Sequence, residues 1–344
     1  MAKSHRKKRL DAKLKKKKGR VKKTAGTHHA AEHSSHSTTS QKQGFYEKYY
    51  KQLLIIPFLL LVAALLAIGA QYAATGDFLN KGIKLKGGTA VTITDDLADI
   101  SSIDVDSIEE LLLQEFPDAD IVTRTQKQLT TPVAINVEID LIEEADIERF
   151  KDVLVENIDD LTAEEVSENL LTTGSSLGQS FFNQVLVALL VAFVLMGIVV
   201  FIKFKVPVPS FAVILAAFSD IVVTLAVVNL LGMKLSTAGI AAFLMLIGYS
   251  VDTDILLSTR VLKRTSGTVY QRVISALKTG VTMNLTTLVA ITVALVVSKS
   301  STITEIMTIL FIGLIVDMIN TWIQNAGILR WYAEKQLQKS RGGK

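Results

Sequence analysis

Carboxylate side chains inside long apolar stretches are the residues of this sequence best suited to chemistry. The segment Gly248-Tyr249-Ser250-Val251-Asp252-Thr253-Asp254 places two of them within one stretch, and Asp220 and Asp317 lie in two others. An ionisable group in the interior of a bilayer costs several kcal/mol or more, so it is rare there without a functional role or a partner. The sequence therefore indicates a protein that handles protons or ions within a membrane.

Asp252 and Asp254 are separated by about 200° around a helix, so they cannot both face the same neighbour. Arg260 follows Asp252 by about two helical turns on a similar face, where it can supply a counter-charge. Two interpretations stay open: the acids bind polar groups to hold helices together, or they load and release protons. The predicted relay residues are Asp220, Asp252, Asp254, Arg260 and Asp317.

Small and polar residues accompany the acids in the apolar stretches. Gly248 permits close helix packing, and Thr286 can bond either to an acid or back to its own helix. The predicted packing or polar partners are Gly248, Tyr249, Ser250, Asn284, Thr286, Asn320 and Asn325.

The elements that must position these residues are membrane helices. A helix needs about 20 apolar residues to cross about 30 Å of hydrocarbon, and 49% of this 344-residue chain is hydrophobic. Six stretches meet the requirement, so we expect an α-helical integral membrane protein with six spans. The expected spans are about 53–74, 182–202, 209–230, 237–258, 281–298 and 303–325.

The distribution of Lys and Arg predicts the orientation of the chain, since these residues favour the cytoplasmic side of short flanking segments. Residues 1–52 carry 16 Lys/Arg against three acids. The loop near 259–280 and the tail 331–344 are also basic, whereas the loops near 231–236 and 299–302 hold only Lys234 and Lys299. We expect a multi-pass protein of the cell membrane with both termini in the cytoplasm.

Residues 76–180 form one long insertion after the first span, 44–75, and are predicted to lie outside the cytoplasm. They contain 24 Asp/Glu against 7 Lys/Arg, a net charge of −17 that the overall charge of +4 conceals. The chain has no cysteine, so this domain must be held by its own core rather than by disulfides. Spans 2–6 are expected within 181–330.

Apolar periodicity in the insertion predicts the order β-α-β-β-α-β. This is the split β-α-β order of ferredoxin-like folds, an α+β arrangement in which both helices cover one face of an antiparallel sheet. The other face would be free for a partner. Gly87 and Gly88 lie in the first strand-like run. The expected elements are strands at 83–94, 121–124, 133–139 and 165–172, and helices at 107–116 and about 147–158.

Residues 1–43 form a basic, His/Ser/Thr-rich arm with almost no apolar content, and such a composition predicts disorder. The arm is either a topology signal alone or a contact for anionic lipid or ribosomal RNA. We expect no metal site in its His residues, which lack Cys or acidic ligands at fixed spacing.

All five His residues lie in this arm, which excludes a Ser-His-Asp or Cys-His centre elsewhere. The chain has no G-x-x-x-x-G-K-[ST] sequence, so it cannot hydrolyse nucleotides through a P-loop. We therefore expect that the protein is not an enzyme, that it has no cofactor and that it does not bind DNA. Energy for transport would come from a gradient or another protein.

Four motifs in order resemble the SecF family in its archaeal form. They are LMLIGYSVDTDILLSTRVLKR at 244–264, the Ser219-Asp220 step, GLIVDMINTWIQNAGILRWY at 313–332 and the Gly87-Gly88 pair. The resemblance covers about 44–332. It implies that the chain belongs to the resistance-nodulation-division superfamily and forms half of a pseudo-symmetric membrane unit completed by SecD.

The resemblance implies a role in protein export through the SecY channel together with SecD. An ion or proton gradient would drive movements of the outer domains, which act on the unfolded exported polypeptide. By position, Asp220, Asp252 and Arg260 fall on polar positions of the family's third and fourth spans. The bacterial pattern has Asn-Asp-Thr after Gly-Tyr-Ser-x, where this chain has Asp252-Thr253-Asp254, and a His at the position of Ser219.

Two alternatives come from other functional classes. One is a half-size exporter of small molecules or lipids from the same superfamily. Exporters of that superfamily usually carry two large outer insertions in one chain of twelve spans, and this chain has half of that. An intramembrane aspartyl protease would need Tyr-Asp and Gly-x-Gly-Asp motifs, and neither occurs here. The export subunit is the preferred prediction.

Overall fold

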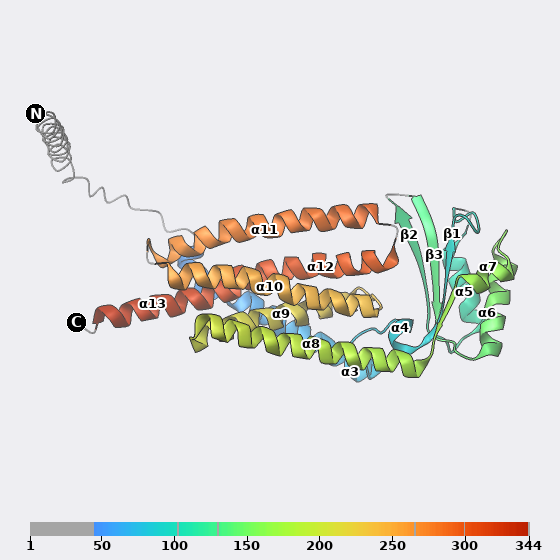
Figure 1. Cartoon of the computed structure of the whole chain (residues 1–344), viewed down its shortest axis with the longest axis horizontal. Helices are drawn as coiled ribbons and strands as arrows, with labels where there is room; N and C mark the ends of the chain where they lie inside the picture. The colour runs from blue at the N-terminus through green and yellow to red at the C-terminus, as the bar shows by residue number, and fades with distance from the viewer. Residues whose placement is uncertain (1–44, 102, 129–130, 265, 299, 343–344) are drawn as a thin grey trace, which may run out of the picture. The chain divides into compact units, whose positions relative to one another are not determined.

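The structure is a computed structural model that describes residues 45–101, 103–128, 131–264, 266–298 and 300–342 (Figure 1). The basic arm, residues 1–43, lies outside the described residues. Its predicted disorder and its contacts with lipid or ribosomal RNA therefore stay predictions.

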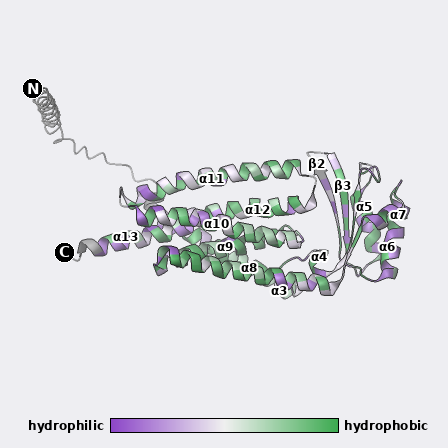
Figure 2. Ribbon diagram, in the orientation of Figure 1, coloured by the Kyte–Doolittle hydropathy of each residue, from purple (hydrophilic) through white to green (hydrophobic). Residues whose placement is uncertain are grey.

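Among the described residues, six helical segments are long and apolar enough to cross a membrane, which agrees with the predicted number. They extend beyond the predicted windows because polar residues continue the helices at their ends. Figure 2 shows hydrophobic residues over most of α8 and largely hydrophilic residues on α13. The helices are α2 (Phe45–Leu53) with α3 (Ile55–Thr75), α8 (Ser175–Phe204), α9 (Pro207–Leu230), α10 (Thr237–Lys263), α11 (Val269–Val297), and α12 (Ser301–Ile319) with its continuation α13 (Ala326–Gly342).

The centre of the helix bundle is formed by α9 and α10. In the 18-residue apolar segment of each helix, 61% of α9 and 56% of α10 is buried. The corresponding buried shares are 17% for the first span and 11% for α8. In addition, α10 packs against α12 and α11, while α3 lies against α9. Asp220 of α9, Asp254 of α10 and Asp317 of α12 are therefore buried between helices.

The insertion folds into a small α/β domain with a four-stranded antiparallel sheet in the order β2-β3-β1-β4. This is the sheet order of the predicted split β-α-β fold. One face carries Val91, Ile93 and Ile135 against Leu112 of α5 and Phe150 of α6. The elements are β1 (Gly88–Thr94), α5 (Val105–Glu115), β2 (Ile121–Gln128), β3 (Thr131–Ile139), α6 (Glu144–Asn157), α7 (Ala163–Glu168) and β4 (Leu170–Thr173).

The predicted starts of two strands were wrong. The first run begins with a helical turn, α4 (Ile83–Lys86), and the strand starts only after Gly87, whose φ is +98°. A side chain at Gly87 would meet the backbone of Ser175 at 2.6 Å, so the glycine lets the start of α8 approach closely. The last run begins as α7, because Thr162 and Glu165 form a capping box.

The second face of the sheet is not free, which corrects the prediction. Its polar side chains Arg124 and Asn136 lie over the α9–α10 connection and the first turns of α12, around Glu305. Asp120, just before β2, pairs with Lys234 of that connection at 2.6 Å and with Lys86 at 3.1 Å. The α/β domain is therefore tied to one end of the helix bundle.

Candidate functional site

Three carboxylates from different helices come together in the bundle. Asp220 of α9, Asp254 of α10 and Asp317 of α12 are each 0% exposed. They are three of the four acids that the sequence placed in the third, fourth and sixth spans; the fourth acid is Asp252. We refer to these three carboxylates, with the side chains that bind them, as the acid cluster.

A single hydroxyl joins two of the acids. Thr321 Oγ1 lies 2.9 Å from Asp254 Oδ1 and 2.9 Å from Asp317 Oδ1. A threonine hydroxyl has one proton, so it can donate to only one carboxylate at a time. The second contact is a hydrogen bond only when that carboxyl group holds a proton and donates it. The geometry thus suits one proton distributed between Asp254 and Asp317.

Uncharged donors satisfy most of the remaining carboxylate oxygens. Asp220 accepts from Ser250 Oγ at 2.5 Å and from Asn320 Nδ2 at 2.7 Å. Asp254 accepts from Asn325 Nδ2 at 2.6 Å, and Asp317 accepts from Asn284 Nδ2 at 3.0 Å. Ser250, Asn284, Asn320 and Asn325, all predicted as polar partners, are therefore in contact with the acids.

Positive charge does not balance the acid cluster within the described part of the chain. None of the ion pairs found among the described residues involves these carboxylates. Asp254 Oδ2, Asn320 Oδ1 and Asn325 Oδ1 are buried acceptors without a hydrogen-bond donor in the same part of the chain. Because buried acceptors require donors or cations, the cluster has the composition of a site for protons or a small cation.

A π-helical turn, η1 (Asn320–Asn325), links α12 and α13 and supplies most of the cluster's donors. Such turns are rare, and those that occur are often found at functional sites. The polar residues of this region recur at the spacing i, i+3, i+4, i+7 and i+8, which places them on one helix face. They are Asp317, Asn320, Thr321, Gln324 and Asn325. Sequence analysis missed Thr321 and Gln324, and this spacing is the signal that could have identified them.

Two predicted relay residues lie outside the acid cluster. Asp252 is exposed, on the opposite side of α10 from the buried Asp254, as their angular separation requires. The guanidinium of Arg260 donates to two oxygens of Ser275, the backbone oxygen at 2.5 Å and the side-chain hydroxyl at 3.2 Å. These bonds join Arg260 to α11, and its role as a counter-charge for Asp252 stays a prediction.

Other predicted partners are also separate from the cluster. Gly248 and Tyr249 lie on the exposed side of α10, and a side chain added at Gly248 would meet no atom within 4 Å. No described residue of this chain therefore packs closely against Gly248. Thr286 donates to Met283 O of its own helix at 2.7 Å. Gly87 and Gly88 lie in the α/β domain and serve its backbone geometry.

The fold and the acid cluster define an integral membrane protein of six spans with one small α/β domain and carboxylates buried between the central helices. A family model described as the C-terminal part of the protein-export membrane protein SecD/SecF matches residues 153–335. The protein-export membrane protein SecF of Pyrococcus furiosus is 37% identical over 286 residues, which cover 81% of this chain and 90% of that protein. The SecF of Methanolacinia petrolearia is 40% identical over 283 residues, 81% of this chain and 93% of that protein. The chain belongs to the SecD/SecF family of protein-export membrane proteins.

A solved structure supports the fold. The crystal structure of SecDF from Thermus thermophilus, described as a translocon-associated membrane protein, matches with a TM-score of 0.68 at 20% sequence identity. The match covers 86% of this chain and only 39% of the SecDF chain. The predicted fold class is confirmed, and the chain spans about two fifths of that larger protein.

Proposed function

We propose that this chain is the SecF-type subunit of a complex with a SecD-type protein, and that the complex assists polypeptide export through a SecY-type channel. Membership of the family supports export as the general role. The fraction of SecDF that this chain matches, 39%, leaves the rest of such a unit to a partner. The termini would face the cytoplasm and the α/β domain the opposite side, as the distribution of Lys and Arg predicts.

We propose further that the acid cluster couples export to an ion or proton gradient. The observation that carries this proposal is the Thr321 hydroxyl, which lies 2.9 Å from both Asp254 and Asp317. A proton that arrives at one carboxyl group changes which oxygen the hydroxyl bonds. Asp220 extends the path, since Asn320, its hydrogen-bond partner, is the residue next to Thr321.

Movement would reach the α/β domain along α10 and α12. Glu305, near the start of α12, accepts hydrogen bonds from Ser236 N and Oγ, both at 2.7 Å, and Ser236 is the N-cap of α10. Lys234, two residues before this cap, pairs with Asp120 of the α/β domain at 2.6 Å. A change in the relative position of α10 and α12 at the acid cluster is therefore transmitted to residues that hold the domain.

The exposed side of α10 is the proposed contact for the SecD-type partner. Asp252 lies there within a membrane-spanning helix, beside Gly248 and Tyr249. A carboxylate that faces lipid is costly, whereas a small-residue face with a polar group packs well against another membrane helix. Coverage of this face by a second subunit removes that cost.

Two matched substitutions on α10 test the proposal in native membranes. In mild detergent, Asp252→Asn is expected to lower recovery of the SecD-type protein with this chain, as identified by mass spectrometry. Asp254→Asn is expected to keep that recovery and to slow gradient-dependent export in cells. Recovery of this chain only with copies of itself, or normal gradient-dependent export by Asp254→Asn, would contradict the proposal.

A further inference from the structure

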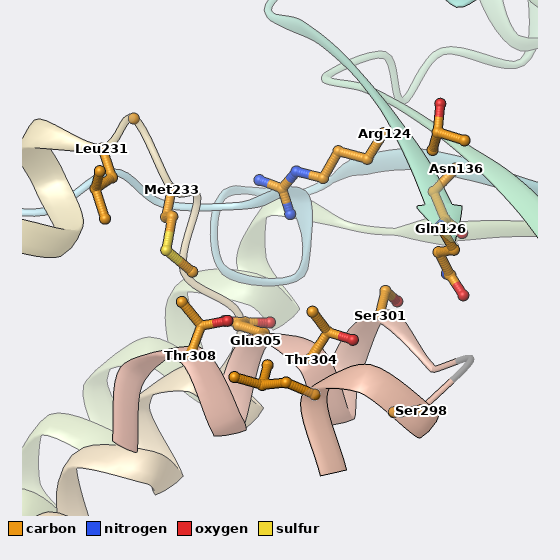
Figure 3. A pocket seen from close by; sticks show the side chains of 13 residues that line it. Arg124, Gln126, Asn136, Leu231, Met233, Ser298, Ser301, Thr304, Glu305 and Thr308 are labelled. Atoms are coloured by element: carbon orange, nitrogen blue, oxygen red, sulfur yellow. The ribbon is translucent and has the colours of Figure 1, made fainter. Parts of the chain in front are cut away.

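A pocket separate from the acid cluster lies between the α/β domain and the helix bundle (Figure 3). Its volume is about 340 Å³. The sheet supplies Arg124, Thr125 and Asn136 on one side, and α12 supplies Glu305 on the other. Met233 and Leu295 add an apolar part of the lining.

The side chain of Asn136 has an unused donor in this pocket. Asn136 is only 8% exposed, and its Oδ1 accepts from Thr92 Oγ1 at 2.7 Å. Its Nδ2 is buried and has no hydrogen-bond partner in the described part of the chain. A buried amide without a partner costs free energy, so a ligand with an acceptor oxygen would be favoured here.

Three consecutive residues of β2, Arg124 to Gln126, also line the pocket. Successive side chains of a strand point to opposite faces, so the middle residue, Thr125, meets a pocket on the face of its two neighbours through its main chain. Among the described strands β2 is one of the two edge strands, with β4 at the other edge. The backbone N–H of Thr123 points outward, since it donates to Glu109 Oε2 at 3.2 Å. By alternation, the N–H and C=O of Thr125 also point away from β3.

The geometry points to this pocket as a binding site for an extended segment of unfolded polypeptide. The segment pairs with the outward backbone groups of β2, its carbonyl oxygens accept from Asn136 Nδ2 or Arg124, and an apolar side chain lies against Met233 and Leu295. Strand addition of this kind takes its affinity from the main chain and so accepts many sequences. The inference rests on the proposed function, since it assigns the exported chain to a particular site.

A lipid headgroup fits the pocket less well. A phosphate could accept from Arg124 and Asn136, but the carboxylate of Glu305 in the same lining would repel it. A headgroup would also leave the backbone edge of Thr125 unused. An extended polypeptide uses the edge, the amide and the apolar lining together.

Photo-crosslinking on the full-length protein in lipid nanodiscs tests this inference. A benzophenone amino acid replaces Thr304, which lines the pocket, or Leu171 of β4, which is 52% exposed on the opposite edge strand. The probes are a labelled peptide of alternating Leu and Thr and the same peptide with Pro in place of each Thr. Proline has no N–H and cannot complete the pairing.

We expect capture of the Leu/Thr peptide at position 304 to exceed capture at position 171 and to fall about tenfold with the Pro peptide. Asn136→Asp keeps the acceptor for Thr92, removes the donor, and is expected to weaken peptide binding about tenfold. Equal capture at both positions, equal capture of both peptides, or capture of lipid alone would overturn the inference. The assay needs no SecD-type partner, channel or gradient, so failure here leaves the coupling role of Asp254 standing.

Discussion

The hydroxyl of Thr321 is the group that distinguishes a relay from a purely structural set of hydrogen bonds. A structural set would give each buried carboxylate its own donors, as Asn320 and Ser250 do for Asp220. Asp254 and Asp317 also have an amide donor each, but in addition they share one hydroxyl, and Asp254 Oδ2 has no donor among the described residues. Such an arrangement permits more than one hydrogen-bond pattern, which is what proton exchange requires.

Replacement of Thr321 by Val tests this residue. The substitution keeps the shape but removes a hydrogen bond to a charged group, worth about 1.5–3 kcal/mol. We expect gradient-dependent export in cells to fall about tenfold or more. Thr286→Val is the matched control, since Thr286 is exposed and donates only to its own helix. Equal export by both variants would exclude a special role for Thr321.

The sequence identifies the three acids of the cluster because a carboxylate stands out in an apolar stretch. It could not choose between Asp252 and Asp254, since helical periodicity separates their faces without saying which face α9 and α12 cover. It missed Thr321 because a threonine in a membrane helix can bond its own backbone, as Thr286 does. Only the packing of η1 against α10 shows the difference.

At the scale of elements, Trp322 of η1 packs against Gly280 of α11, beside the acid cluster. A side chain at Gly280 of α11 would lie 2.1 Å from the ring of Trp322, which is 5% exposed. The glycine therefore allows the indole ring to lie directly against α11, next to the donors Thr321 and Asn320.

Gly280→Ala is expected to displace Trp322 and to lower the free energy of unfolding by about 1–3 kcal/mol, as overpacking does. Thermal unfolding in detergent measures the change. Gly248→Ala is the matched control on the exposed side of α10, where no atom lies within 4 Å, and it should cause no loss. A stable Gly280→Ala protein would show that the ring moves freely.

The ion pairs of Asp120 with Lys234 and Lys86 predict that the contact between the α/β domain and the helix bundle depends on pH. Partial burial raises the pKa of Asp120, but hydrogen bonds and charge from Lys234 and Lys86 outweigh it, so the net pKa is lowered. Because this pKa is lowered, the ion pairs of Asp120 contribute fully to stability above the ordinary aspartate pKa of about 3.9. Their contribution is lost as the pH falls through the lowered pKa.

Hydrogen exchange of the α9–α10 connection measures this tie. Asp120→Asn is expected to speed exchange near neutral pH, and the difference from the unmodified protein should shrink as the pH falls below about 3.9. Asp118→Asn is a nearby control, since no ion pair is found for Asp118 within the described ranges. An Asp120→Asn effect that is independent of pH would rule out the charge pair as its cause.

Most of the α/β domain could be predicted from apolar periodicity, which specified the order of strands and the two main helices. The short helices α4 and α7 could not, because runs of four to six residues do not separate the helical from the strand period. For α7 a local signal exists, the Thr162 to Glu165 capping box. The contact of the second sheet face with the bundle depends on tertiary structure and has no such signal.

At the scale of the whole molecule, the proposed mechanism requires that the α/β domain and the basic connections lie on opposite sides of the membrane. The absence of cysteine from the sequence makes single-cysteine labelling unambiguous. We expect Ser101→Cys in the α/β domain to react with a membrane-impermeant maleimide on intact cells. Ser266→Cys, between α10 and α11, should react only after permeabilisation. Labelling of both from the same side would contradict the predicted orientation.

The central claim, that the acid cluster moves ions, is tested most directly by proton uptake into proteoliposomes. The purified complex of this chain with its SecD-type partner would be reconstituted around a pH-sensitive dye and energised with an imposed gradient. The account predicts uptake by the unmodified complex and by Thr286→Val, and uptake at the level of protein-free liposomes for Asp254→Asn. Uptake by Asp254→Asn equal to that of the unmodified complex would contradict it.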